Sequence, residues 1–315
     1  MRFTPTDYRA YVQISQKRHL LVEGRDDKRA FKVLLDEVDL KFGIGCSAEI
    51  DIDTASDLVE FSSPLGNREK VEHIAASISG RQYAERFVAF VDREFREFRI
   101  GNVLEDFTSA SKIVDRLIWS RGHSLENYYF NLEILRAPFR DLSVIPDFDK
   151  ALNLLDRVFE SAIRMACAAS LTGLELDLLW LVKNCIHWQT LRINNEAITF
   201  DVDDWKKRLQ SQGPPGCDTA MIVERFEHWR KIVEGTGLEI ARFLCHGHIG
   251  FSYIWAAYAR CVYEVTNNAT EVTRVLRADE SLRLNATASS WARFFRGSHN
   301  YPCDVLRLLA VPHSF

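Results

Sequence analysis

The sequence lacks several features that would assign it to common protein classes. Its seven cysteines include no Cys-x-x-Cys pair, which favours free thiols in a reducing compartment over a disulfide framework or a zinc ribbon. Its most apolar stretch, 165–182, is interrupted by Glu175 and Asp177, and its first residues contain no apolar signal segment. A Gly-x-x-x-x-Gly-Lys-Ser/Thr loop is absent, so any ATP dependence would have to come from a partner. We therefore expect a cytoplasmic protein with no membrane segment.

An excess of positive charge is also missing. The chain has 44 acidic residues against 40 lysines and arginines, which gives a formal net charge of −4. This balance argues against a broadly basic nucleic-acid binder and restricts any contact with nucleic acid to a local patch. With 315 residues, 47% of them hydrophobic, the chain can build one large domain or two ordinary ones.

Residues 19–28 have the pattern of a buried strand, a tight turn and the start of a helix. The apolar run 20–22 suits a strand covered on both faces, and Gly24 suits a sharp turn. Asp26 is the expected N-cap of the helix that follows, in which apolar residues recur on one face. Glu23 would then lie at the carboxyl end of a strand, where open α/β sheets bind their ligands.

Two more predicted strands are followed closely by acidic residues. The apolar run 87–91 leads into Asp92 and Glu94, whose two-residue spacing along an extended segment would direct both carboxylates the same way. A third short strand, 117–120, precedes Ser124, a candidate helix cap that would place Glu126 in the first turn. Because strands alternate with helices, we expect a parallel sheet with these acids along one edge.

The carboxylates at this expected edge suit a hard divalent cation. Oxygen ligands from Glu23, Asp92, Glu94 and Glu126 favour Mg²⁺ or Mn²⁺ over zinc. A pair of such ions can stabilise both the attacking and the leaving oxygen of a phosphoryl transfer. The residue types therefore predict phosphoryl-transfer chemistry.

The second half of the sequence changes character. Pro138 and Pro146 mark an expected linker, and an amphipathic helix is expected over 152–166. Further helical patterns recur at roughly 174–185, 203–211, 218–234 and 251–265. We expect an α/β fold, with a Rossmann-like parallel-sheet domain over 1–135 followed by a mostly helical domain over 136–315.

The first half resembles the Toprim family, which includes topoisomerases, bacterial primases and the overcoming-lysogenisation-defect nucleases. Residues 21–27, Leu-Val-Glu-Gly-Arg-Asp-Asp, match the family's glutamate-bearing strand and turn, and residues 88–94 match its Asp-x-Asp strand with Glu94 in place of the second aspartate. Residues 123–128, His-Ser-Leu-Glu-Asn-Tyr, resemble a segment carried by one branch of Toprim proteins. Members of that branch occur beside ATPases in anti-phage systems and include the Toprim effector of the PARIS system.

This resemblance implies a function and a set of partners. It implies a toxic Mg²⁺- or Mn²⁺-dependent nuclease, held inactive by an ABC- or AAA-type ATPase partner and directed at RNA, with host tRNA ahead of DNA. It makes Glu23, Asp92, Glu94 and Glu126 the metal and catalytic residues. The alternatives are a DNA nuclease of the overcoming-lysogenisation-defect type and a non-catalytic subunit that docks on an ATPase. A homodimer is a further expectation, because one acidic site with little basic surface would need a second subunit to build a nucleic-acid channel.

Several other residues have two interpretations at this level. Arg93, Arg96 and Arg99 suit either a nucleic-acid backbone or a solvated face. The acidic residues that alternate along 49–53 are interpreted as a solvated strand face. The tryptophans of the second half could include a base-stacking platform, although most are expected in the core. The roles of His123, His246 and His248 stay open.

Overall fold

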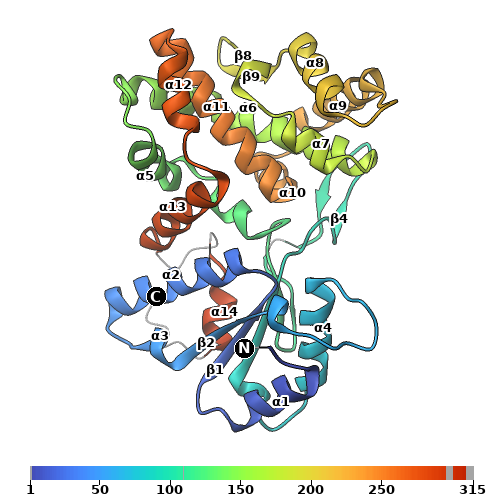
Figure 1. The fold of residues 1–315 in the computed structure, drawn as a ribbon, viewed down its shortest axis with the longest axis vertical. Coiled ribbons are helices and arrows are strands. Elements are labelled where there is room, and N and C mark those ends of the chain that lie inside the picture. The colour runs from blue at the N-terminus through green and yellow to red at the C-terminus, as the bar shows by residue number, and fades with distance from the viewer. Residues whose placement is uncertain (1, 109, 296–300, 310–315) are drawn as a thin grey trace. The chain divides into compact units, whose positions relative to one another are not determined.

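The computed structural model describes residues 2–108, 110–295 and 301–309, and the chain forms two compact units within it (Figure 1). The first unit comprises residues 1–93, 108–128 and 284–315, and the second comprises 94–107 and 129–283. The chain therefore crosses between the units four times, whereas the sequence pattern suggested one boundary at 135. No helix among the described residues is both long and apolar enough to span a membrane.

The first unit is built on a five-stranded sheet in the order β2-β1-β3-β7-β6. Strands β2, β1, β3 and β7 are parallel, and β6 adds an antiparallel edge. The strands are β1 (Arg18–Val22), β2 (Ile50–Thr54), β3 (Phe87–Val91), β6 (Ile113–Val114) and β7 (Leu117–Trp119). The predicted parallel sheet is thus confirmed.

Helices cover both faces of this sheet, as the apolar strands require. They are α1 (Pro5–Ile14), α2 (Arg25–Phe42), α3 (Cys46–Glu49), α4 (Asn67–Ile78) and α14 (Cys303–Leu308), with short 3₁₀ turns η1 (Ala55–Asp57), η2 (Ala84–Arg86) and η3 (Leu125–Tyr129). Leu21 of β1 and Ala89 of β3 join a buried cluster with residues of α1 and α4. On the other face, the ring of Phe31 in α2 meets Phe90 of β3 edge to face, with centroids 5.0 Å apart. Alternate strand residues therefore serve two cores.

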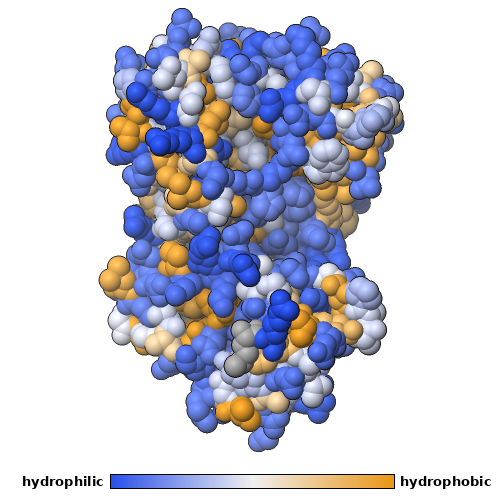
Figure 2. Space-filling model, in the orientation of Figure 1, coloured by the Kyte–Doolittle hydropathy of each residue, from blue (hydrophilic) through white to orange (hydrophobic). Residues whose placement is uncertain are grey.

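The second unit is mostly helical, as predicted. Its helices are α5 (Leu132–Leu142), α6 (Phe148–Glu175), α7 (Leu179–Asn184), α8 (Val202–Gln212), α9 (Thr219–Glu234), α10 (Leu238–Leu244), α11 (Gly247–Thr266) and α12 (Ala269–Leu276). Helix α13 (Glu280–Arg293) carries the chain from this unit into the first. Figure 2 shows hydrophilic residues over most of the face in view, with apolar ones in small separate groups.

Three features of the second unit differ from expectation. The expected linker is helix α5, which contains Pro138 in its interior. Strands β8 (Leu191–Asn194) and β9 (Ala197–Phe200) form a hairpin that the helical periodicity did not indicate, and β4 (Phe98–Arg99) pairs with β5 (Glu105–Asp106). The hairpin turns at Asn195, whose φ of +57° lies in the left-handed region that asparagine tolerates.

Gly250 allows α11 to pass close to the ring of Phe130. A Cβ atom on Gly250 would lie 2.5 Å from two carbons of that buried ring and 2.9 Å from Sγ of Cys245. We expect Gly250→Ala to reduce the free energy of unfolding by about 1–3 kcal/mol, because the ring must move in a close-packed interior. Chemical denaturation would measure it. Gly235→Ala is the matched control, since its nearest new contact is 3.6 Å away, and equal effects of the two substitutions would contradict this account.

Candidate functional site

The site lies where three neighbouring parallel strands end. Glu23 follows β1, Asp92 follows β3, and the segment 120–126 follows β7. Since β3 lies between β1 and β7 in the sheet, Asp92 occupies the middle position. The expected convergence of acids at one sheet edge is therefore present for Glu23, Asp92 and Glu126, and all three side chains are half-buried.

Hydrogen bonds join the three strand ends. The backbone amide of Asp92 donates to Oε1 of Glu23 at 2.8 Å, and the amide of Leu125 donates to Oδ1 of Asp92 at 3.0 Å. The hydroxyl of Ser124 donates to Oε2 of Glu126 at 2.5 Å. Each carboxylate thus has one oxygen fixed by a local donor, and this holds the side chain in place.

Asp27 is a fourth acid of the site, which the sequence analysis did not select. Asp26 was the expected N-cap of α2, but the N-cap is Gly24, and Asp26 is exposed. Asp27 occupies the third position of the helix, where its Oδ2 accepts from the amide of Gly24 at 3.0 Å. A glycine cap with an acidic residue three positions later is the available sequence signal, because that side chain can reach back to the cap.

Two of the four acids have raised pKa values. Burial raises the pKa of Asp92 well above its usual range, and the charges of Asp27, Glu126 and Glu23 add to the effect. Burial also raises the pKa of Asp27 to about 8, with Glu126 and Glu23 as the next causes. Carboxyl groups that resist ionisation near neutral pH are typical of sites that bind a cation or exchange a proton.

Glu94 does not extend this set in the expected way. The strand ends at Val91, and Glu94 has a φ of +56° within a turn, where its side chain is exposed. The prediction that an extended backbone directs the side chains of Asp92 and Glu94 the same way is therefore wrong. Its role as a metal ligand remains a prediction that this backbone geometry does not favour.

Two arginines support the backbone around Asp92. Arg93, expected on the surface, is only 1% exposed, and its Nη1 donates to the carbonyl of Arg121 at 2.8 Å while its backbone amide donates to Oγ of Ser120 at 2.9 Å. Arg68 of α4, which the sequence analysis missed, donates from Nη1 to the carbonyl oxygen of Asp92. By contrast, Arg99 is exposed and pairs with Glu105 at 3.1 Å. Arg93 therefore has a positioning role.

The acidic residues of β2 form a paired network in place of the expected solvated face. Asp51 accepts from the hydroxyl of Tyr11 at 3.0 Å and from Nζ of Lys17 at 2.9 Å. Asp53 accepts from the hydroxyl of Tyr8 at 2.8 Å and lies 3.1 Å from Nδ1 of the buried His19. A cavity of about 380 Å³ beside this strand is lined by residues of β2 and α2, and none of the four site acids lines it.

A metal ion fits the chemistry of the site but not its present arrangement. Glu23, Asp27, Asp92 and Glu126 supply only oxygen donors, which suit Mg²⁺ or Mn²⁺. Within residues 2–108, 110–295 and 301–309, however, no group of three or more His, Cys, Asp or Glu side chains is arranged to hold a metal ion. The four acids interact through their charges without forming a closed ligand set.

Most tryptophans of the second half are buried, as expected, whereas Trp180 is 52% exposed. Trp205, Trp255 and Trp291 are fully buried, and Trp229 is 7% exposed. Trp188 is half-buried.

Comparison with other proteins adds no assignment for either unit. No known protein family matches this chain, and no curated protein matches it either.

Proposed function

We propose that this chain is a divalent-metal-dependent nuclease of the Toprim type. The observation that carries the proposal is the convergence of Glu23, Asp27, Asp92 and Glu126 in one half-buried cluster, with the pKa values of two of them raised by burial and by the other acids. Mutual repulsion among four carboxylates favours the binding of a divalent cation. Such an ion would supply charge neutralisation at a phosphodiester.

The residues of the chain have separable roles in this proposal. Asp92 and Glu23 would be the central ligands, because the hydrogen bond between the Asp92 amide and Glu23 Oε1 links their two strands. Glu126 lies after β7 and Asp27 lies in α2 after β1, so they would complete the set from the two strands that flank β3. Loading of the site requires the carboxyl groups to lose their protons, so affinity for the cation should rise with pH.

The resemblance of residues 21–27, 88–94 and 123–128 to Toprim effectors supports RNA, and host tRNA in particular, as the substrate. It also supports a toxic role in anti-phage defence and control by a partner ATPase. Cleavage of total tRNA and of plasmid DNA by the purified chain, in Mg²⁺, in Mn²⁺ and in EDTA, tests the activity and the choice of substrate together. The same chain co-expressed with an ATPase partner tests the control.

The matched variants for this assay are Glu23→Ala and Glu49→Ala. Glu49 lies in the same unit but is exposed, and its nearest cation is Arg18 at 3.9 Å. We expect metal-dependent cleavage to be lost in Glu23→Ala and retained in Glu49→Ala. Equal cleavage by Glu23→Ala and the unchanged chain would refute a metal-dependent nuclease at this site.

A second candidate function is a non-catalytic subunit that docks on an ATPase. It is favoured by the exposed, left-handed turn at Glu94 and by the open arrangement of the four acids. Calorimetric titration with Mn²⁺ separates the candidates. Binding that disappears in Glu23→Ala supports the nuclease, whereas an absence of binding supports the docking subunit.

A further inference from the structure

Two adjoining cavities lie on the helical unit and share the side chain of His187. Their volumes are about 400 Å³ and about 470 Å³. The first is lined by residues of α7, α11, the end of α12 and the start of α13, together with Trp188. The second is lined by His187, Gln189, Thr190 and one side of α8. We call the two cavities together the His187 groove.

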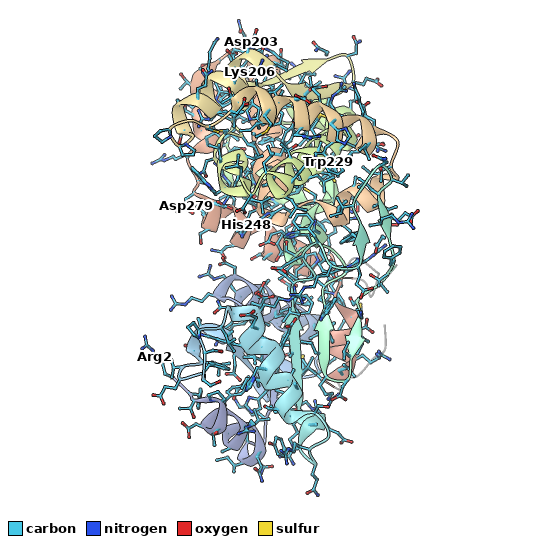
Figure 3. The ribbon with its side chains drawn as sticks, turned by 90° about the vertical axis from the view of Figure 1, so that its right-hand side faces the viewer. Arg2, Asp203, Lys206, Trp229, His248 and Asp279 are labelled. Carbon is cyan, nitrogen blue, oxygen red and sulfur yellow. The ribbon has the colours of Figure 1, made fainter. Side chains whose placement is uncertain are left out.

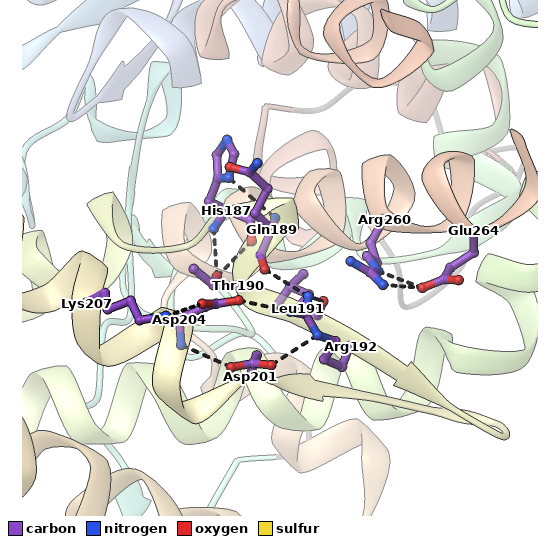
Figure 4. A network of polar contacts seen from close by, with 10 residues as sticks. All are labelled: His187, Gln189, Thr190, Leu191, Arg192, Asp201, Asp204, Lys207, Arg260 and Glu264. Atoms are coloured by element: carbon purple, nitrogen blue, oxygen red, sulfur yellow. Dashed lines mark hydrogen bonds and ion pairs between the residues drawn. The ribbon is translucent and has the colours of Figure 1, made fainter. Parts of the chain in front are cut away.

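The groove has more positive than negative side chains, although the whole chain is acidic. Its cations are Lys183, Arg283, Lys207 and Arg208, and its acids are Glu280 and Asp204. Glu280 pairs with Lys183 at 2.8 Å. Asp204 pairs with Lys207 at 3.0 Å, as Figure 4 shows. Asp204 also accepts from Arg192 at 2.9 Å, outside the groove lining. The lining therefore retains an excess of two positive charges for an anion.

Among the described residues that line the groove, Arg208 is a cation without a carboxylate partner. Across the residues that the structure describes, its Nε atom is buried and has no hydrogen-bond partner, and no carboxylate pairs with its guanidinium. Arg208 is half-buried and lines the second cavity, so an anion there would meet a guanidinium group without a carboxylate partner. The planar guanidinium group matches the oxygens of a phosphate in particular.

Trp188 supplies an aromatic surface in the adjoining cavity. Its ring lies 4.9 Å from that of Tyr263 and 5.9 Å from that of His187, and these neighbours hold it in place. Burial lowers the pKa of His187 to about 4, with the charge of Arg208 adding to the effect, so the imidazole is neutral at pH 7. Its Nδ1 accepts from the amide of Gln189 at 3.4 Å, which leaves the proton on Nε2 as a donor.

We propose that the His187 groove binds a nucleotide, with the base against Trp188 and the phosphate beside Arg208. A base and a phosphate are the two groups that this pairing of an indole ring and a guanidinium recognises. The same chemistry occurs in a single-stranded RNA and in a free nucleotide. The proposal deepens the proposed function, on which it rests for the choice of RNA as the first probe.

The test measures binding without cleavage, in EDTA. A fluorescein-labelled single-stranded RNA of about 12 nucleotides would be titrated with the intact chain over a series of salt concentrations and followed by anisotropy. Arg208→Gln should weaken binding by about tenfold and reduce the slope of log K against log salt by about 0.7. Lys206→Gln is the matched control, because Lys206 lies on the same helix outside the lining (Figure 3) and should change affinity by less than about twofold.

Two further variants separate contact from folding. Trp188→Leu should weaken binding by about 5- to 100-fold with little change in salt slope, since stacking is not ionic. Arg208→Lys should restore the slope but not the full affinity, because lysine keeps the charge and loses the planar fork. A thermal melt of each variant shows whether its loss of binding reflects unfolding.

Competition with AMP identifies the source of the ligand. RNA binding at least about tenfold tighter than AMP assigns the groove to a strand, and equal affinities assign it to a free nucleotide. Unchanged binding of both probes in Arg208→Gln and Trp188→Leu would overturn the proposal. If both variants bind normally but the chain still cleaves its substrate, the groove proposal fails and the proposed nuclease function stands. If the groove binds RNA but no metal-dependent cleavage is found, only the proposed nuclease function fails.

Discussion

An Asp92→Asn chain should lose at least about a thousandfold of its metal-dependent cleavage and at the same time unfold at a higher temperature in metal-free buffer. Asparagine keeps Oδ1, which accepts the hydrogen bond from the Leu125 amide, so the local structure is retained. It removes a carboxyl group whose pKa is raised well above its usual range, by burial first and then by the charges of Asp27, Glu126 and Glu23. A raised pKa of this kind lowers stability at pH values above the ordinary pKa of the group. The substitution therefore removes a proposed metal ligand and also relieves the repulsion between this carboxyl group and the other acids.

The opposite directions of these two effects distinguish a functional acid from a structural one. A residue selected for stability would lower both quantities when it is changed. Cleavage kinetics and scanning calorimetry on the same preparation provide the two measurements. Asp115→Asn is the control, because Asp115 is exposed in the turn before β7, at the opposite end of the strand from the site. A stable Asp92→Asn chain with undiminished cleavage would contradict the proposed function.

The stability of the metal-free protein should fall as the pH rises from about 5 to 8, by about 1–3 kcal/mol after allowance for solvent screening. The pKa of Asp27 is about 8 in the folded chain, against an ordinary value of 3.8. Below pH 4 the Asp27 carboxyl is protonated in both the folded and the unfolded chain, so its full contribution to the free energy of unfolding is present. Between these values the unfolded chain loses the proton and the folded chain keeps it, so unfolding is increasingly favoured. Above pH 8 the dependence levels off.

Asp27→Asn should flatten this pH dependence, and Asp26→Asn should not. Both residues lie in the first turn of α2, but Asp26 is exposed and adjoins Arg29 at 3.7 Å. Denaturant unfolding at a series of pH values would measure the difference. Saturating Mn²⁺ should also flatten the curve of the unchanged chain, because a bound cation favours the ionised carboxyls. If the unchanged chain, Asp27→Asn and Asp26→Asn all had the same pH dependence of stability, Asp27 would not titrate in this range.

The sequence pattern located most of the sheet edge correctly. Apolar runs at 20–22 and 87–91 are long enough to identify buried strands, and the next polar residue of each is necessarily near a strand end. That reasoning identified Glu23 and Asp92, and the helical periodicity after residue 150 identified the second unit. Local composition is sufficient for these points because burial on both faces demands an unbroken apolar run.

Other features depended on backbone geometry that composition does not specify. Glu94 was expected beside Asp92 because the strand was taken to continue, whereas the strand ends at Val91 and Glu94 lies in a turn with a positive φ. Asp26 and Asp27 are chemically identical neighbours, and only the start of the helix decides which of them reaches Gly24. Arg93 follows an acid in a charged run that suggests exposure, yet its side chain is buried and donates to the carbonyl of Arg121 in the loop after β7.

The sequence by itself determined that this chain has an α/β first half, a helical second half and acids after three strands, because periodicity and apolar run length reflect burial directly. Only the tertiary structure decided that Asp27 joins the cluster, that residues 284–295 and 301–309 return to the first unit, and that Arg208 and Trp188 line one groove. These outcomes depend on which distant segments meet. Contacts between segments far apart in sequence leave no periodic signal in either segment.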